Sequence, residues 1–222
     1  MRKVSFSIIF VIALTLTGLL LSGCSKGEPV NRTREVYMLM DTSGTYAQEL
    51  KKAQNIINYL LGKLQPMDSF AVARIDSGSF SEKDIIHKVT FDSRPSMTTN
   101  QKRVFAQKVD DFVKTVKSSP YTDISGGMLQ GVEWLDESKT GKRIILVFSD
   151  MEEELPKGHI RDFTIPFNNT HVVALNVTKL RTDIVDPRVY MDRLSVWQAK
   201  VEAGGGTWEV INDLDNLEDI LD

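Results

Sequence analysis

The chain has 222 residues, of which 41% are hydrophobic and 26% are charged, as is typical of a globular protein with one ordinary domain. Its formal net charge is −3 and its sequence contains no basic cluster, which argues against a nucleic-acid partner. A single cysteine, Cys24, excludes an intramolecular disulfide.

The N-terminal stretch has the pattern of an exported and lipid-anchored protein. A basic start followed by a mostly apolar stretch predicts a signal peptide over residues 1–23. Its end, Leu21-Ser22-Gly23-Cys24, resembles the bacterial lipobox, in which the cysteine is lipidated and becomes the new N-terminus. A transmembrane anchor is the alternative, because the apolar stretch is nearly long enough to span a bilayer. The position of the only cysteine favours a lipidated Cys24, with residues 24–33 as the lipidated end and a short polar tether.

Lipidation would place the protein in the bacterial cell envelope, with the lipid membrane as one partner. Each buried CH₂ group of an acyl chain contributes roughly 0.8 kcal/mol, so several acyl chains hold a protein firmly at a membrane. Ser25 follows the cysteine, where an aspartate would resemble an inner-membrane retention signal. In a host with two membranes, we therefore expect the outer membrane.

The domain itself, residues 34–222, alternates strand-like and helix-like segments. Short apolar or alternating runs predict strands, and apolar residues every three to four positions predict helices. Strands are expected at residues 35–40, 68–75, 85–91, 143–148, 171–177 and 207–211, and helices at 50–64, 99–117, 124–137, 188–203 and 214–221. Residues 151–170 and 179–187 show no clear period and are expected to be mostly loop.

Four of these segments allow sharper predictions. The alternation in residues 85–91 predicts an edge strand. Arg94-Pro95-Ser96 indicates a break before the second helix. The glycines at 204–206 predict a turn rather than a phosphate-binding loop, because they follow a helix and not a strand. The inward face of the helix at 188–203 is expected to consist of Met191, Leu194, Trp197 and Val201.

The alternation predicts an α/β fold, a doubly wound, mostly parallel six-stranded sheet with helices on both faces. In the common order of such sheets, the first and fourth strands are neighbours and ligands bind beyond their carboxyl ends. The first strand is followed by Asp41-Thr42-Ser43-Gly44-Thr45, and the fourth by Ser149-Asp150. The topology therefore brings polar side chains from both strand ends to one crevice: Asp41, Ser43, Thr45 and Asp150.

Oxygen is the only ligand atom that these four side chains offer, and oxygen ligands are preferred by a hard cation such as Mg²⁺. The alternative is that Asp41 and Thr45 only cap the start of the following helix. The four residues alone leave both interpretations open.

The set resembles the metal-ion-dependent adhesion site of von Willebrand factor type A domains. The first motif of that family, Asp-x-Ser-x-Ser after the first strand, matches residues 41–45, with Thr45 in place of the last serine. The family's threonine matches Thr122, and its last aspartate matches Asp150. The resemblance covers residues 34–222 and implies the Rossmann-like fold of these domains.

The resemblance implies a Mg²⁺ site, with Mn²⁺ and Ca²⁺ as alternative ions, formed by Asp41, Ser43, Thr45, Thr122 and Asp150. In this family the hydroxyls bind the ion directly, whereas the aspartates act largely through bound water. An open position on the ion then takes a carboxylate from a partner protein. Asp123 is expected to cap the third helix rather than bind the ion. Met151 stands where many members of the family carry glycine.

Other chemistries lack the residues they need. The three histidines are far apart and have no zinc-hydrolase spacing. The sequence contains neither a Walker loop nor a nucleophile elbow. A metal-dependent hydrolase would need a general base near the ion, where Asp41 and Asp150 already have ligand roles. The glutamates at 152–154 are expected to form a solvated loop, with repulsion of wrong partners as the alternative.

We therefore expect a lipid-anchored, non-enzymatic domain that binds a protein partner through Mg²⁺. The alternative is a structural subunit of an envelope or secretion assembly with a vestigial site, and tight binding of a divalent ion would separate the two. The loop after the fifth strand should lie on the same rim as Asp41. Its candidates for partner binding are Arg181, Asp183 and Asp186, with a simple solvated loop as the alternative.

Overall fold

The structure, a computed structural model, describes residues 32–44, 46–137, 141–212, 217, 220 and 221. The chain divides into two units, Met1–Asn31 and Arg32–Asp222, and the described residues all belong to the second. The predicted signal peptide, Cys24, most of the tether, Thr45 and most of the predicted closing helix lie outside these residues. Within the described part, no helix is both long enough and apolar enough to cross a lipid bilayer.

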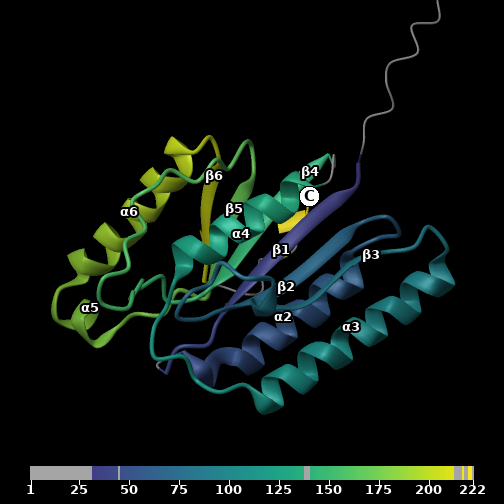
Figure 1. The fold of residues 1–222 in the computed structure, drawn as a ribbon, viewed down its shortest axis with the longest axis horizontal. Coiled ribbons are helices and arrows are strands. Elements are labelled where there is room, and N and C mark those ends of the chain that lie inside the picture. Colours follow the sequence, from purple (N-terminus) through teal and green to yellow (C-terminus); the bar gives the residue numbers. More distant parts are fainter. Residues whose placement is uncertain (1–31, 45, 138–140, 213–216, 218–219, 222) are drawn as a thin grey trace, which may run out of the picture. The chain divides into compact units, whose positions relative to one another are not determined.

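Six strands form one sheet in the order β3-β2-β1-β4-β5-β6 (Figure 1). Every neighbouring pair is parallel except β2 and β3, which are antiparallel. The strands are β1 (Arg34–Asp41), β2 (Ser69–Ile75), β3 (Ile85–Thr90), β4 (Lys142–Phe148), β5 (His171–Leu175) and β6 (Thr207–Ile211). The predicted six-stranded, mostly parallel sheet is confirmed, with the first and fourth strands adjacent and the third strand at an edge.

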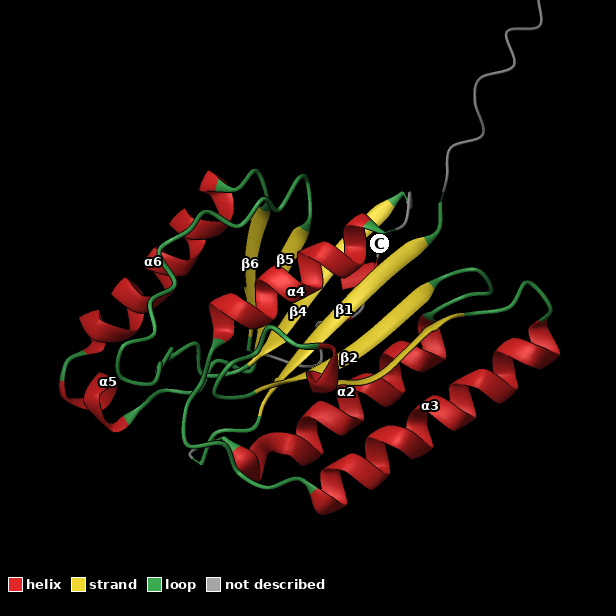
Figure 2. Cartoon of the chain, in the orientation of Figure 1, coloured by secondary structure: helices red, strands yellow, loops and turns green. Residues whose placement is uncertain are grey.

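Helices cover both faces of this sheet (Figure 2). Residues of α2 and α3 pack into the core on one face, and residues of α4 and α6 pack into the core on the other. The α-helices are α2 (Leu50–Lys63), α3 (Pro95–Thr115), α4 (Ile124–Asp136), α5 (Arg181–Val185) and α6 (Pro187–Ala203), and the 3₁₀ turns are η1 (Ala47–Glu49) and η2 (Glu82–Asp84). This arrangement confirms the predicted doubly wound α/β fold.

Strand β1 supplies both cores. Because successive side chains of a strand point to opposite faces, its apolar run is divided between the two layers. Val36, Met38 and Met40 are buried on the α2 and α3 side. Tyr37 and Leu39 are buried on the α4 and α6 side. Each fully buried apolar side chain contributes about 1.5–3 kcal/mol, so this strand holds the two layers together and fixes the position of its own carboxyl end.

Helix α4 lies unusually close to β1 because two of its residues have no side chain at the contact. A Cβ atom at Gly131 would lie 2.7 Å from the ring of Tyr37, and one at Gly127 would lie 2.9 Å from Leu39. Both distances are shorter than real carbon contacts, so a side chain at either position would force the Tyr37 ring or the end of the Leu39 side chain to shift. The close packing fixes the N-terminus of α4, and with it Thr122, relative to the end of β1.

Three sequence-based expectations about the helices were wrong. Helix α3 begins at Pro95, the residue interpreted as a break, because proline fits the first position of a helix, where no backbone donor is needed. The predicted loop at 179–187 contains the short helix α5. Met191 is 59% exposed, because the buried residues of α6, Trp197 and Val201, lie in its second half.

Candidate metal centre

The predicted site lies at the carboxyl edge of the central strands. Strands β1 and β4 pair in parallel, so their carboxyl ends meet at the same edge of the sheet. Asp41 is the last residue of β1, and Asp150 follows β4 by two residues. Both are buried, with 0% and 3% of their surfaces exposed. The structure therefore brings these two carboxylates together.

The carboxylate of Asp41 is held by hydrogen bonds from Ser43 and Ser149. Its Oδ1 accepts the backbone N–H of Ser43 at 2.8 Å, and its Oδ2 accepts the hydroxyl of Ser149 at 2.7 Å. Burial raises the pKa of Asp41, and the hydrogen bonds from Ser149 and Ser43 only partly oppose this. A cation in the crevice would favour the ionised form of this side chain.

The carboxylate of Asp150 also has a raised pKa. Burial raises its pKa to about 6, and the negative charge of Asp41 adds to this effect. The backbone N–H of Glu152, 2.9 Å from Oδ1, and the more distant charge of Arg193 both lower the pKa. A dication would relieve both the burial of the negative charge of Asp150 and its repulsion by Asp41.

The hydroxyls of the site come from two loops that hydrogen bonds hold in place. Ser43 forms a bridge with Ser119, whose N–H donates to the carbonyl of Thr42 at 2.8 Å. Thr122 pairs with Glu154 through backbone bonds of 2.7 and 3.0 Å. Although Thr122 is only 3% exposed, its hydroxyl makes no hydrogen bond within the described part of the chain. This hydroxyl is therefore available to a ligand.

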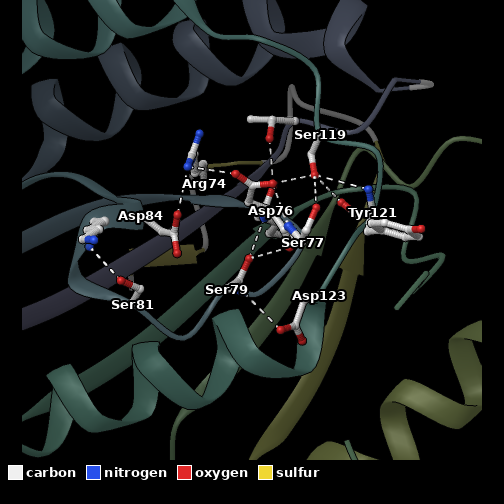
Figure 3. Close-up of polar contacts among 12 residues, drawn as sticks. Arg74, Asp76, Ser77, Ser79, Ser81, Asp84, Ser119, Tyr121 and Asp123 are labelled. Atoms are coloured by element: carbon white, nitrogen blue, oxygen red, sulfur yellow. Dashed lines mark hydrogen bonds and ion pairs between the residues drawn. The ribbon is translucent and has the colours of Figure 1, made fainter. Parts of the chain in front are cut away.

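The loop that carries Thr122 is fixed by a second polar network (Figure 3). The hydroxyl of Ser119 donates to Asp76 at 2.7 Å, and Asp76 also pairs with Arg74 at 2.8 Å. The same hydroxyl accepts the N–H of Tyr121 at 3.3 Å. The loop between α3 and α4 is thus tied to the loop after β2, which limits the positions that Thr122 can take.

Asp123 has the structural role that the sequence predicts. Its carboxylate caps α4 by accepting the N–H of Gly126 at 2.8 Å. It also accepts the N–H of Ser79 at 3.1 Å and forms an ion pair with Arg161. Its two oxygens are therefore engaged by protein donors, and the helix-cap prediction is confirmed.

These residues surround a cleft of about 520 Å³. The cleft is lined by Ser43, Gly44, Ser118, Ser119, Pro120, Thr122, Asp150, Glu152, Glu154 and Leu180. Three of the five predicted metal ligands are on this list, and Asp41 lies buried beneath them. Two glutamates of the predicted solvated loop line the cleft as well, whereas Glu153 accepts hydrogen bonds from Ser125.

Met151 adopts a backbone conformation that usually belongs to glycine. Its φ is 63°, in the left-handed region, although its side chain is fully buried. Its N–H donates to the hydroxyl of Ser149 at 3.0 Å, and its carbonyl accepts the indole N–H of Trp197 at 2.9 Å. A non-glycine residue pays roughly 1–2 kcal/mol for this conformation, which explains why glycine suits the position after the site aspartate.

The three predicted rim residues differ in their exposure. Arg181 is exposed. Asp186 is half-buried, caps α6 and pairs with Arg188. Asp183 is only 1% exposed and binds Arg193 at 2.6 Å, so its side chain is not accessible to a partner.

A hard divalent cation fits this set of donors. The side chains of Ser43, Thr122 and Asp150 would hold it, with the charge of Asp41 behind them, and all of these atoms are oxygens. Among the described residues, no three His, Cys, Asp or Glu side chains gather as a metal cluster, so hydroxyls would have to complete the coordination. Thr45 lies outside the described residues and stays a prediction.

Comparisons with known proteins give structural matches alone. No protein-family model matches the chain, and no curated protein matches it in sequence. The pilus adhesin SpaC from Lactobacillus rhamnosus GG aligns with a TM-score of 0.51 at 10% identity, over 85% of this chain and 29% of the adhesin.

Two further structures align at TM-scores below 0.5. A von Willebrand factor type A structure from Catenulispora acidiphila aligns at 0.49 and 14% identity, over 85% of this chain and 41% of that one. An aerotolerance-related membrane protein from Bacteroides fragilis aligns at 0.47 and 14% identity, over 82% and 93%. The chain thus spans less than half the length of the structure from Catenulispora acidiphila and less than half the length of the adhesin. At 10% identity the likeness to the adhesin is one of fold alone, and it agrees with the predicted doubly wound, mostly parallel six-stranded α/β fold.

Proposed function

We propose that this chain binds a partner protein through a divalent cation, Mg²⁺ in the first place, held at the cleft beside β1 and β4. The observation that supports this is the gathering of Ser43, Thr122 and Asp150 around one cleft, with Asp41 buried beneath it. These residues come from three separate parts of the sequence. The convergence of these residues on one cleft is expected if they bind the same ligand. If they only capped helices, none of them would need to face a cleft.

The charged and the neutral residues of the site would have different roles. Asp41 and Asp150 supply the negative charge that attracts a dication, and Ser43 and Thr122 supply neutral oxygens. Neutral direct ligands leave the ion electron-poor, and Mg²⁺ keeps exchangeable positions that a further oxygen ligand can occupy. A carboxylate of a partner protein would take such a position, where the surrounding protein shields the contact from water and strengthens it.

The domain would work at a membrane surface of the bacterial envelope, anchored by lipid at Cys24. Support for the anchor comes from the lipobox-like run alone. The tether has only about ten residues, which favours partners at or near the membrane. Partners would then be other envelope proteins, and the outer membrane is the proposed location in a host with two membranes.

Calorimetric titration with Mg²⁺ and Mn²⁺ tests the ion site. Asp41→Ala should abolish the heat of binding, because it removes one of the two buried carboxylates that attract the dication. The matched control is Asp162→Asn, which also removes one negative charge but at an exposed position outside the cleft, and it should bind like the wild type. Equal affinity of the wild type and Asp41→Ala would eliminate the proposed site.

A second experiment tests the partner. Proteins captured from native membranes by the wild type should be lost when a chelator is added and recovered when Mg²⁺ is restored. Asp41→Ala should capture none of them at any Mg²⁺ concentration. Capture that persists in chelator would favour the alternative, a structural subunit of an envelope assembly with a vestigial site.

A further inference from the structure

Arg193, on α6, connects two loops that line the cleft without lining it itself. Its Nη1 lies 3.1 Å from a carboxylate oxygen of Glu152, in the loop after β4. Its Nη2 lies 2.6 Å from Asp183, at the start of α5. Only 8% of the Arg193 side chain and none of the Asp183 side chain is exposed. A guanidinium is planar and rigid, so it holds two carboxylates in a fixed relative position.

Each of these contacts leads on to the cleft through one further hydrogen bond. The N–H of Glu152 donates to Oδ1 of Asp150 at 2.9 Å. The carboxylate of Asp183 accepts the N–H of Leu180 at 2.8 Å. Glu152, Asp150 and Leu180 all line the cleft. One side chain on α6 therefore sets the position of the loop after β4 and of the loop after β5.

This arrangement is a poor way to gain stability alone. Buried ion pairs such as Arg193–Asp183 are often no more stabilising than apolar residues of the same volume, because charges lose their hydration, and half-exposed pairs such as Arg193–Glu152 contribute little. The Nε of Arg193 is also buried without a hydrogen-bond partner within the described part of the chain, which adds a further cost. What the guanidinium supplies, and an apolar side chain could not, is a fixed geometry between the two loops.

We propose that Arg193 is a positioning residue for the ion. Through Glu152 it holds Asp150 at a fixed distance from the loop after β5, and this spacing lets the cleft bind a dication. The proposal rests on the proposed function, because it concerns the same cleft. Residues that orient metal ligands from outside commonly change metal affinity by about 10–100-fold when they are replaced. The same range is expected here for variants that break the connection and leave the ligands in place.

The first test uses two glutamates with the same charge in the same cleft. Glu152→Gln removes the negative charge that pairs with Arg193, whereas Glu154→Gln removes an exposed charge of the same cleft that has no such ion pair within the described part of the chain. Calorimetry on the full chain should show Mg²⁺ affinity lowered by about 10–100-fold in Glu152→Gln. The loss in Glu154→Gln should be less than about fivefold, as for other exposed charges. Equal losses would overturn the proposal, because charge alone would then explain both.

The second test keeps the charge and changes the geometry. Arg193→Lys retains a cation near Asp150, but its flexible ammonium group lacks the rigid planar fork that contacts Asp183 through two nitrogens and Glu152 through one of them. It should weaken Mg²⁺ binding about as much as Glu152→Gln. Arg188→Lys is the matched control, because Arg188 lies on the same helix and is exposed. Wild-type affinity in Arg193→Lys would show that only the charge matters and would overturn the proposal.

Amide hydrogen exchange in chelator separates this proposal from the proposed function. Arg193→Lys should speed exchange at the N–H groups of Glu152 and Leu180, relative to Arg188→Lys, whether or not an ion binds. A wild-type protein that takes up no Mg²⁺ would overturn the proposed function and this role with it, even if exchange changes as expected. Unchanged exchange in a protein that binds Mg²⁺ would overturn the positioning role alone.

Discussion

Replacement of Asp150 by asparagine should have opposite effects on the metal-free protein and on ion binding. Asparagine keeps nearly the same shape, and its side-chain oxygen can still accept the N–H of Glu152. The substitution removes only the negative charge, which in the metal-free protein is buried and close to Asp41. We expect a more stable protein in chelator and a protein that no longer binds Mg²⁺.

The size of the stabilisation follows from the pKa of Asp150. Burial, assisted by Asp41, raises this pKa from 3.8 to about 6, so the folded state holds the proton more tightly than the unfolded state does. Each tenfold change in proton affinity is worth about 1.4 kcal/mol, so full ionisation costs the folded state about 3 kcal/mol. Between about pH 4 and pH 6 the unfolded chain ionises first, and the free energy of unfolding falls as the pH rises.

Urea denaturation in chelator at two pH values measures this difference. At a pH of about 7.5, Asp150→Asn should exceed the wild type in free energy of unfolding by up to about 3 kcal/mol. At a pH of about 4, where Asp150 is protonated in the folded state, the two proteins should be about equally stable. With Mg²⁺ at a hundred times its dissociation constant, the wild type alone should gain about 2.7 kcal/mol.

Two results would refute this reasoning. An Asp150→Asn variant that is no more stable than the wild type at the higher pH in chelator would show that the charge of Asp150 is already well compensated. A gain of the same size at both pH values would show that the effect arises from packing and not from ionisation.

Three further predictions concern the anchor, the backbone and the rim. Cys24→Ser should release the protein from membranes or block its maturation, and a matured variant that stays bound at high salt would contradict the lipid anchor. Met151→Gly should relieve about 1–2 kcal/mol of strain but lose about 2–5 kcal/mol of packing. Its free energy of unfolding should therefore fall by about 1–3 kcal/mol, and an unchanged value in urea denaturation would contradict the packing argument. Arg181→Ala should leave Mg²⁺ affinity unchanged and weaken partner capture, and full capture would favour a simple solvated loop.

Much of the fold could be predicted because local sequence and global topology agree. The run from Glu35 to Met40 is apolar at every position after the first. Such a run is typical of a strand that is buried on both faces, and β1 does contact a core on each face. The alternation of strands and helices then limits the possible strand orders, and Asp41 and Asp150 meet as a result. Asp123 was predictable as a cap because the chemistry of a helix start is local.

The parts that escaped prediction depend on contacts between distant elements. Helix α5 is five residues long, too short for a hydrophobic period, and so its segment was interpreted as loop. Asp183 was therefore expected at the surface, although it is buried against Arg193. Nothing in the sequence around Arg193 distinguishes it from an exposed arginine on a helix. Met191 shows the same difficulty, since its spacing fits the inward face but the first half of α6 has little core to cover.

The candidate site was predictable in its composition and less so in its surroundings. The hydroxyls and carboxylates stand directly after strands, where position in the sequence determines position in space. Glu152 and Glu154 are exposed, as a run of three glutamates predicts, but the run gave no indication that they line the cleft. The bridge between Thr122 and Glu154 turns this segment toward the cleft, and a pairing of segments about thirty residues apart has no local signal.

The hydrogen bond from Trp197 to the carbonyl of Met151 links the fluorescence of this tryptophan to the loop after β4. The indole is 3% exposed and is joined directly to the residue after Asp150. A shift of that peptide group when a ligand arrives would alter the polarity that the excited ring experiences, and with it the wavelength and yield of its emission. Trp134 and Trp208 have no such bond to the loop after β4 and would contribute a steady background. Occupancy of the cleft could therefore be followed by fluorescence in the unlabelled protein.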